Sequence, residues 1–200
     1  MFTIHGWSFD KSVWRNTEFE KFHHFELPGH GESPFKETDL EKLAFEMGEV
    51  VSGGTVVGWS IGATVALLLA FYFPAKIERL VLFSPTPSFC KVSQNPIVCK
   101  NFLRKLRRDY ERTVKWFRKE CRFDGDVPLP EKEKAITLLE SFMKLDISDI
   151  LPKINVPVSI YVGQKDKITT LQGAFQVFRY LPKATLKVYP GKEHYIFGGI

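Results

Sequence analysis

The sequence TVVGWSIG at residues 55–62 decides the fold of this chain, and Ser60 stands in it between two glycines. A β-branched run opens this stretch, and an apolar segment of helical length, residues 63–73, follows it. The pattern predicts a strand, a sharp turn and a helix, with the serine at the apex of the turn. The glycines let the strand and the helix approach closely while Ser60 takes a strained backbone conformation. We therefore predict a nucleophile elbow and acyl-transfer chemistry at Ser60.

An activated serine needs a general base and a group that orients this base. Asp166 lies just past the strand-like run 156–162, and His194 lies just past the strand-like run 184–189. In an open sheet, the carboxyl ends of the strands meet at the edge where sites assemble. The chain order serine, aspartate, histidine is one of the orders in which serine hydrolases carry a catalytic triad. We predict that Ser60 is the nucleophile, His194 the base and Asp166 the residue that orients the base.

Two turns near the start of the chain complete the pattern. The first is IHGW at residues 4–7, and the second is LPGHGES at residues 27–33, after another strand-like run. Negative charge develops on the carbonyl oxygen of a tetrahedral intermediate, and two backbone N–H groups can stabilise it. We expect these two donors at Trp7, after the His-Gly turn, and at Ile61, after the nucleophile.

Each catalytic candidate also has a purely structural interpretation. Ser60 could cap a helix, Asp166 could accept a hydrogen bond within a turn, and His194 could be a surface histidine. Three such residues in this order, at the ends of three strand-like runs, favour catalysis. Four other histidines compete for the role of base. His5 and His30 lie in the turn motifs, where backbone hydrogen bonds are expected. His23 and His24 lie in a strand-like run.

Length and composition indicate one globular domain. The chain has 200 residues, with 44% hydrophobic and 14% aromatic content, which suffices for a single α/β core. Apolar runs stay below the ~20 residues of a membrane span, and the first residues show no charged region or cleavage site. We expect a cytoplasmic monomer or weak dimer that binds neither membrane nor metal. The three cysteines lack metal-site spacing, so we expect reduced structural thiols at Cys90, Cys99 and Cys121.

The chain divides into a core and an insertion. Residues 1–84 and 151–200 alternate between strand-like and helical patterns, which predicts an α/β core with a mostly parallel sheet of about six strands. Residues 85–150 have little β-branched periodicity, much charge, and prolines at the entrance and inside. We predict that this segment is an α-helical lid inserted between core strands.

The predicted lid is strongly basic. Residues 91–122 hold eleven Lys and Arg against three Asp and Glu, a net charge of +8, whereas the whole chain carries +5. If this stretch is helical, its apolar residues form one stripe made of Leu103, Leu106, Tyr110, Val114, Phe117 and Cys121. A basic stripe lies beside it, made of Arg104, Arg108, Arg112, Lys115, Lys119 and Arg122.

Positive charge concentrated in this way favours an acidic partner. A solvated helix face is the simpler alternative. Nucleic acid is disfavoured, because no nucleic-acid-binding motif accompanies the stripe. An acidic acyl carrier protein, which presents its cargo on a phosphopantetheine arm, fits both the predicted hydrolase core and the basic lid.

These motifs resemble the α/β-hydrolase superfamily and, within it, the pimeloyl-[acyl-carrier protein] methyl ester esterases of biotin synthesis. The closer resemblance rests on Trp7 and Trp59, on the Ser-Pro pair at residues 84–85 followed by Cys90, and on RTVKWF at residues 112–117. It implies hydrolysis of the methyl ester of a carrier-bound pimeloyl chain to the free carboxylate and methanol. It also implies acyl carrier protein as the partner and no cofactor.

The resemblance assigns further roles to single residues. It places Trp7, Trp59 and Phe117 at the substrate. It implies a carrier-docking surface on the lid, formed by Arg104, Arg108, Arg112, Lys115 and Arg118. Arg112 aligns with one carrier-contacting arginine of that family. The next such arginine falls near Trp116 here, so Lys115 or Arg118 would take its place.

The chain departs from the superfamily at both ends. It lacks the two strands that commonly precede the His-Gly turn, and it ends six residues after His194, where relatives continue into a final helix. We therefore expect a trimmed sheet.

Two other functions stay open. One is a broad carboxylesterase, or a hydrolase of another acyl thioester or cyclic ester, for which the basic lid is incidental. The other is a non-catalytic binding module, which the intact serine, aspartate and histidine disfavour. A panel of substrates distinguishes the broad esterase from the carrier-specific enzyme. Covalent labelling by a fluorophosphonate distinguishes a catalytic protein from a binding module.

Overall fold

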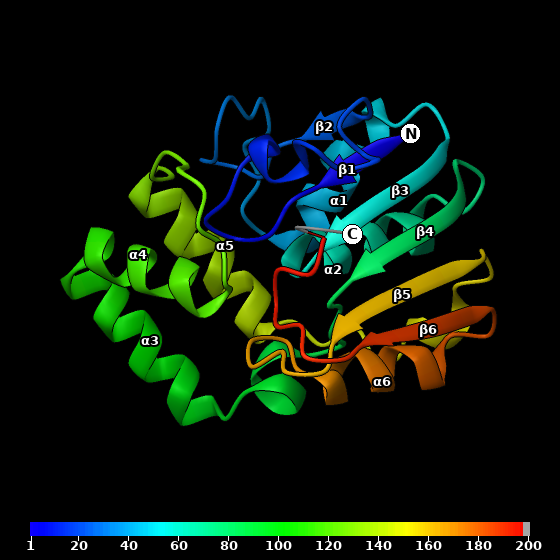
Figure 1. Cartoon of the computed structure of the whole chain (residues 1–200). Coiled ribbons are helices and arrows are strands. Elements are labelled where there is room, and N and C mark those ends of the chain that lie inside the picture. Colours follow the sequence, from blue (N-terminus) through cyan, green and yellow to red (C-terminus); the bar gives the residue numbers. More distant parts are fainter. Residues whose placement is uncertain (198–200) are drawn as a thin grey trace.

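A six-stranded parallel sheet forms the centre of the protein (Figure 1). The computed structural model describes residues 1–197, so the last three residues of the predicted core lie outside it. The strand order is β2-β1-β3-β4-β5-β6, and every neighbouring pair is parallel. The strands are β1 (Phe2–Ile4), β2 (His23–Phe25), β3 (Gly54–Trp59), β4 (Ile77–Phe83), β5 (Val158–Gly163) and β6 (Ala184–Tyr189). The predicted sheet is confirmed, with one short strand, β1, before the His-Gly turn.

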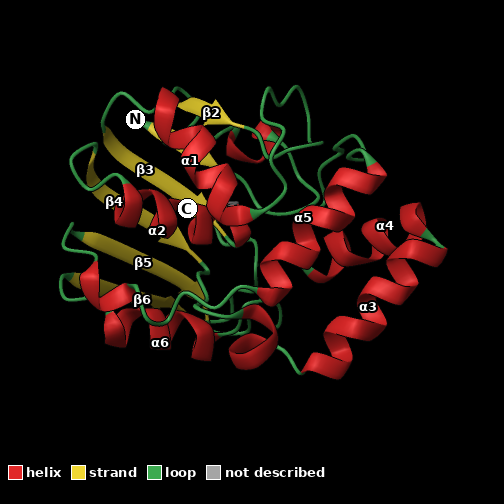
Figure 2. Ribbon diagram, turned by 180° about the vertical axis from the view of Figure 1, so that it is seen from behind, coloured by secondary structure: helices red, strands yellow, loops and turns green. Residues whose placement is uncertain are grey.

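Three helices cover one face of this sheet (Figure 2). They are α1 (Leu40–Val50), α2 (Ile61–Tyr72) and α6 (Leu171–Tyr180). Residues 61–70 of α2 are all buried, as expected of a helix that is apolar on every side. This buried helix begins directly after Ser60, so the core itself fixes the position of the serine.

The opposite face of the sheet packs against an aromatic cluster. Val57, Trp59 and Phe83 point to this face, because successive strand residues alternate between the two faces. They meet side chains from the segment after β1, which includes the 3-10 helix η1 (Lys11–Trp14), and from the end of the described chain, namely Phe9, Val13, Trp14, Phe19, Ile196 and Phe197. The cluster therefore anchors the segment just after His194 against the strand that leads to Ser60.

Between β4 and β5 the chain forms helices, as predicted for this segment. They are the short turns η2 (Phe89–Ser93) and η3 (Leu151–Lys153) and the helices α3 (Pro96–Arg108), α4 (Tyr110–Glu120) and α5 (Lys132–Lys144). We call α3, α4 and α5 the helical insert; they lie beyond the carboxyl ends of the strands (Figure 1). The apolar stripe is not one continuous helix face, because Asp109 leaves the helical conformation (φ −143°, ψ 80°) and separates α3 from α4.

A disulfide joins Cys90 to Cys99 and so links η2 to α3. The expectation of three reduced cysteines is therefore wrong for this pair. The chain reverses between the two residues, since Asn95 caps α3 and Pro96 begins it, and the reversal brings Cys99 back to η2. Cys121 is a free, buried thiol, as expected of a structural cysteine.

Backbone contacts at the elbow leave no room for a side chain at its glycines. A Cβ on Gly62 would lie 2.3 Å from the carbonyl oxygen of Ile4 and 2.6 Å from that of His5. A Cβ on Gly58 would lie 2.4 Å from the carbonyl oxygen of Gly62. Glycine is therefore required for the close approach of β3, α2 and the His-Gly turn.

We expect Gly62→Ala to destabilise the protein by about 3 kcal/mol or more, although alanine is the better helix former. The reason is that the new Cβ meets backbone atoms, which cannot move aside. Gly48→Ala in α1 is the matched control, because the atoms nearest to its Cβ would belong to the ring of Phe73, a side chain that can shift, and not to the backbone. Chemical denaturation measures both variants, and a Gly62→Ala protein as stable as the wild type would contradict this geometry.

Candidate active site

Ser60 sits at the apex of a tight turn between β3 and α2. Its φ of 59° and ψ of −120° are strained for a residue with a side chain, as predicted for a nucleophile elbow. The turn is held by the Ser60 amide, which donates to the carbonyl oxygen of Phe83 at 2.9 Å, and by the Ala63 amide, which donates to the carbonyl oxygen of Ser60 at 2.9 Å. Strain of this kind is characteristic of functional sites.

Asp166 and His194 form a buried hydrogen-bonded pair. Nδ1 of His194 lies 2.9 Å from Oδ2 of Asp166, and both side chains are almost completely buried. Burial alone would raise the pKa of Asp166, but the His194 imidazole and its hydrogen bond hold this pKa below its usual value. The carboxylate is therefore ionised and can orient the imidazole; the catalytic role of the pair stays a prediction.

Trp59 links the elbow to the loop that carries His194. Its indole Nε1 donates to the carbonyl oxygen of His194 at 3.1 Å, and its ring centroid lies 5.3 Å from that of the imidazole. Trp59 is fully buried, so its predicted role in binding substrate is wrong. Within residues 1–197 no hydrogen bond joins Ser60 Oγ to His194. Such contacts often tighten only in the substrate complex, and this contact stays a prediction.

The two predicted oxyanion donors lie at suitable backbone positions. Ile61 is the first residue of α2, where helix amides are unpaired and the helix dipole favours negative charge. In the described part of the chain, neither the Ile61 nor the Trp7 amide donates to a protein acceptor. The Trp7 indole donates to the carbonyl oxygen of Ala135 at 2.8 Å, which ties the His-Gly turn to α5. The oxyanion hole itself stays a prediction.

A cavity of about 350 Å³ opens at Ser60, between the sheet edge and the helical insert. Its interior is largely apolar, lined among others by Trp7, Phe89, Phe102, Phe117, Phe142 and Met143. Three charged side chains also line it, namely Lys105, Glu120 and Lys167. All three are exposed, which places them at the rim. The cavity therefore suits an aliphatic acyl chain with a polar group left near solvent.

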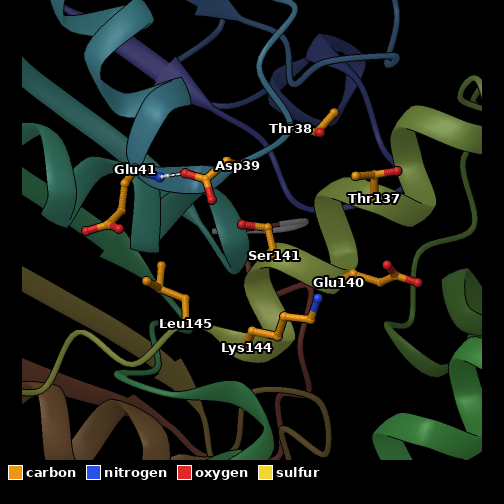
Figure 3. A pocket seen from close by; sticks show the side chains of 8 residues that line it. All are labelled: Thr38, Asp39, Glu41, Thr137, Glu140, Ser141, Lys144 and Leu145. Carbon is orange, nitrogen blue, oxygen red and sulfur yellow. Dashed lines mark hydrogen bonds between the residues drawn. The ribbon is translucent and has the colours of Figure 1, made fainter.

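A second cavity, of about 360 Å³, lies between the start of α1 and α5 (Figure 3). Seven of its eight lining residues are polar or charged, among them Asp39, Glu41 and Glu140. The hydroxyl of Ser141 there already accepts a hydrogen bond from the amide of Leu40 at 3.0 Å. None of the predicted catalytic residues lines this cavity, so it is not the reaction site.

A family model described as the alpha/beta hydrolase family matches residues 1–198. The chain belongs to the alpha/beta hydrolase family. It is 29% identical to a pimeloyl-[acyl-carrier protein] methyl ester esterase from Nitrosomonas europaea, in an alignment that covers 96% of this chain and 86% of that protein. It is 27% identical to the protein of the same name from Nitrosospira multiformis, in an alignment that covers 97% of this chain and 87% of that protein.

Solved structures share the fold of this hydrolase. An esterase from Exiguobacterium antarcticum matches with a TM-score of 0.83 and 18% identity, over 97% of this chain and 85% of that one. MenH from S. aureus matches with a TM-score of 0.77 and 22% identity, over 96% and 85% of the two chains. Together with the relatives, the family confirms the predicted superfamily and supports a carboxylic ester hydrolase.

His5 and His30 are occupied by backbone hydrogen bonds, as expected from their turn motifs. Nδ1 of His5 donates to the carbonyl oxygen of Gly6 at 2.8 Å, and its Nε2 accepts from the amide of Leu27 at 3.0 Å. His30 accepts from the amide of Ser8 at 3.0 Å and donates to the carbonyl oxygen of Pro28 at 2.9 Å. Both histidines therefore fix the two turns together and are excluded as the base of this hydrolase.

The buried His30 makes a testable contribution to stability. Burial, followed by the charge of His5, lowers the pKa of His30 to about 3, against about 6.5 in an unfolded chain. Between these values the unfolded state binds a proton that the folded state does not, so stability falls as the pH falls. We expect a loss of about 2 kcal/mol from His30 between pH 7 and pH 5.

Urea denaturation at the two pH values measures this loss. His30→Gln should show a smaller loss than the wild type, whereas His23→Gln, at an exposed histidine of β2, should keep the wild-type loss. An unchanged pH dependence in His30→Gln would show that His30 does not titrate as proposed.

The basic residues predicted for carrier docking separate into two groups. Arg104, Arg108, Arg112 and Lys115 are exposed on α3 and α4. Arg118 is buried, and its guanidinium donates to the carbonyl oxygens of Ser8, Val127 and Pro128. The docking role predicted for Arg118 is therefore wrong. This arginine connects the helical insert to the core instead.

Several lining residues of the cavity at Ser60 were not predicted from the sequence, among them Phe89, Phe102, Lys105 and Lys167. Phe102 and Lys105 lie on α3 within the basic segment, but periodicity alone does not show which helix face meets the sheet edge. Among the described residues, no group of three or more His, Cys, Asp or Glu side chains could hold a metal ion. No described helix combines the length and apolar content that a bilayer crossing requires.

Proposed function

We propose that this hydrolase is a serine esterase that converts the methyl ester of pimeloyl-acyl carrier protein to the free carboxylate and methanol, in biotin synthesis. The observation that carries the proposal is the position of Ser60, which lines an apolar cavity and follows directly after Trp59, the residue that binds the His194 loop. The names of the relatives from Nitrosomonas europaea and Nitrosospira multiformis supply the substrate.

In the proposed mechanism, Ser60 attacks the ester carbonyl while His194 takes the serine proton. The same imidazole then protonates the departing methanol and later activates the water that releases the acid. Asp166, ionised and 2.9 Å from Nδ1, stabilises the positively charged imidazole in each step. The amides of Trp7 and Ile61 stabilise the oxyanion, at ~3 kcal/mol for each donor in sites of this kind.

The apolar cavity also favours release of the product. The neutral methyl ester and its methylene chain gain from burial against side chains such as Phe117 and Phe142. The product carries a carboxylate, and an unpaired charge is costly to keep in an apolar cavity. Hydrolysis therefore converts a well-bound substrate into a poorly bound product.

We further propose that the acidic carrier docks on the exposed basic face of the helical insert. A third hollow, of about 320 Å³, is lined by Asp109 and Thr113, by Arg108 and Arg112, and by Lys105 and Trp116. The last two residues also line the cavity at Ser60, so the basic surface adjoins the entrance of the substrate cavity. A phosphopantetheine arm could pass from one to the other, with the insert acting as a lid.

A broad carboxylesterase is the second candidate, and ion pairs within the insert favour it. Arg107 pairs with Glu140, and Lys115 pairs with Glu111, so part of the positive charge is neutralised locally. A substrate panel distinguishes the two functions: pimeloyl-carrier methyl ester, free methyl pimelate, and p-nitrophenyl esters of increasing chain length. The carrier-specific function requires a much higher kcat/KM for the carrier-bound ester, and equal values throughout the panel would support the broad esterase.

A further inference from the structure

Thr169 lies against the carboxylate of Asp166. Its side chain is completely buried, and its hydroxyl oxygen is 3.2 Å from Oδ2 of Asp166 and 3.5 Å from Nδ1 of His194. Its amide donates to Oδ1 of Asp166, also at 3.2 Å. Thr169 therefore contacts both carboxylate oxygens and reaches the imidazole that shares one of them.

Thr169 is itself held from two other directions. Its hydroxyl has one proton and two acceptors, Oδ2 of Asp166 at 3.2 Å and the carbonyl oxygen of Ser84, just after β4, at 2.8 Å, so it shares this proton between the carboxylate and the sheet edge. The hydroxyl of Ser93, at the end of η2, donates to the carbonyl oxygen of Thr169 at 2.5 Å. The threonine is thus fixed between the sheet edge and the root of the helical insert, and it cannot follow a rotation of the Asp166 side chain.

We propose that Thr169 is a positioning residue for the reaction proposed above, because it holds Asp166 in the rotamer that presents Oδ2 to His194. Oδ1 is retained by the amides of Ile168, at 2.8 Å, and Thr169. Oδ2 is hydrogen-bonded to the imidazole and to the Thr169 hydroxyl. The buried hydroxyl of Ser84, which has no other hydrogen-bond partner among the described residues, also helps to lower the pKa of Asp166. Without the Thr169 hydroxyl, the carboxylate rotates more freely and stabilises the positively charged imidazole less well. The inference rests on the proposed function.

The pH profile of the enzyme reports this effect with little interference from nearby groups. The thiol of Cys121 is buried beside the pair; burial, followed by the charge of Asp166, raises its pKa well above the usual value, so it stays neutral. Lys165 and Lys167, on the same loop as Asp166, are exposed. The acid limb of kcat/KM is therefore the readout that distinguishes positioning of the pair from a purely structural role.

The test replaces Thr169 by valine, which keeps the shape and removes the hydroxyl. With p-nitrophenyl acetate, we expect kcat to fall about tenfold, with KM unchanged; this is the lower end of the effect of a hydrogen bond to a charged group, because the proton is shared with Ser84. We also expect the acid limb of kcat/KM to move to lower pH. Thr169→Ser, which keeps the hydroxyl, should restore both kcat and the acid limb to near wild-type values.

Thr64→Val is the matched control. Thr64 is a buried threonine of α2 whose hydroxyl has no hydrogen-bond partner among the described residues, so this variant should match the wild type. A Thr169→Val enzyme with wild-type kcat and acid limb would overturn this inference and leave the proposed function intact. A loss of kcat that Thr169→Ser does not restore, or an acid limb that stays in place, would also overturn it, because the role would then be structural. A wild type that hydrolyses no ester would reject the proposed function together with the inference.

Discussion

Ser60→Ala should lower the hydrolysis of p-nitrophenyl acetate by at least about a thousandfold, because alanine provides no oxygen to form the acyl-enzyme. What remains would come from binding and from the oxyanion donors. The effect should lie in kcat, since the cavity keeps its shape. Initial rates at saturating substrate measure it, and circular dichroism shows whether the variant is folded.

Ser8→Ala is the matched control for this substitution. Ser8 is also buried, and its hydroxyl has no hydrogen-bond partner in the described chain. It should therefore keep nearly the full activity. Turnover retained in a folded Ser60→Ala protein would remove Ser60 from the proposed mechanism.

The double substitution Arg108→Ala and Arg112→Ala should slow hydrolysis of the carrier-bound ester by roughly tenfold or more, while hydrolysis of a free ester stays nearly unchanged. Both arginines are exposed, line the hollow beside the substrate cavity, and have no salt-bridge partner among the described residues. Their removal weakens attraction to an acidic carrier and leaves the chemistry at Ser60 intact. The ratio of the two kcat/KM values measures this, and the difference should shrink at high salt.

Arg15→Ala with Arg179→Ala is the matched control for charge. This pair removes the same two positive charges from exposed positions outside the helical insert, after η1 and on α6. It should leave the ratio of carrier-bound to free ester at the wild-type value. Equal losses on both substrates for the Arg108→Ala and Arg112→Ala variant, or an equal change in ratio for the control, would argue against a docking surface on the helical insert.

The local parts of the fold could be predicted because short stretches determine them. The run before Ser60, its flanking glycines and the apolar helix after it predict the elbow, and the observed φ of 59° confirms its strain. The hydrogen bonds of His5 and His30 also follow from their turns. In each case the deciding contacts lie within a few residues, or between two motifs that the superfamily resemblance already relates.

The helical insert could be predicted only in outline, because its details depend on distant contacts. Arg118 has the same sequence surroundings as the exposed arginines, yet it is buried against Ser8, 110 residues away. The helical period continues through Asp109, where the chain in fact bends. Thr169 was missed for the same reason, since its partners Ser84 and Ser93 come from other elements.

The central claim is that Ser60, His194 and Asp166 act as one unit beside an oxyanion hole. The most direct measurement is a crystal structure of the protein after reaction with a fluorophosphonate. The account predicts phosphorus bonded to Ser60 Oγ, the phosphoryl oxygen accepting from the amides of Trp7 and Ile61, and His194 within hydrogen-bond distance of the adduct. An adduct on another residue, or one on Ser60 with His194 turned away and the phosphoryl oxygen in solvent, would contradict it.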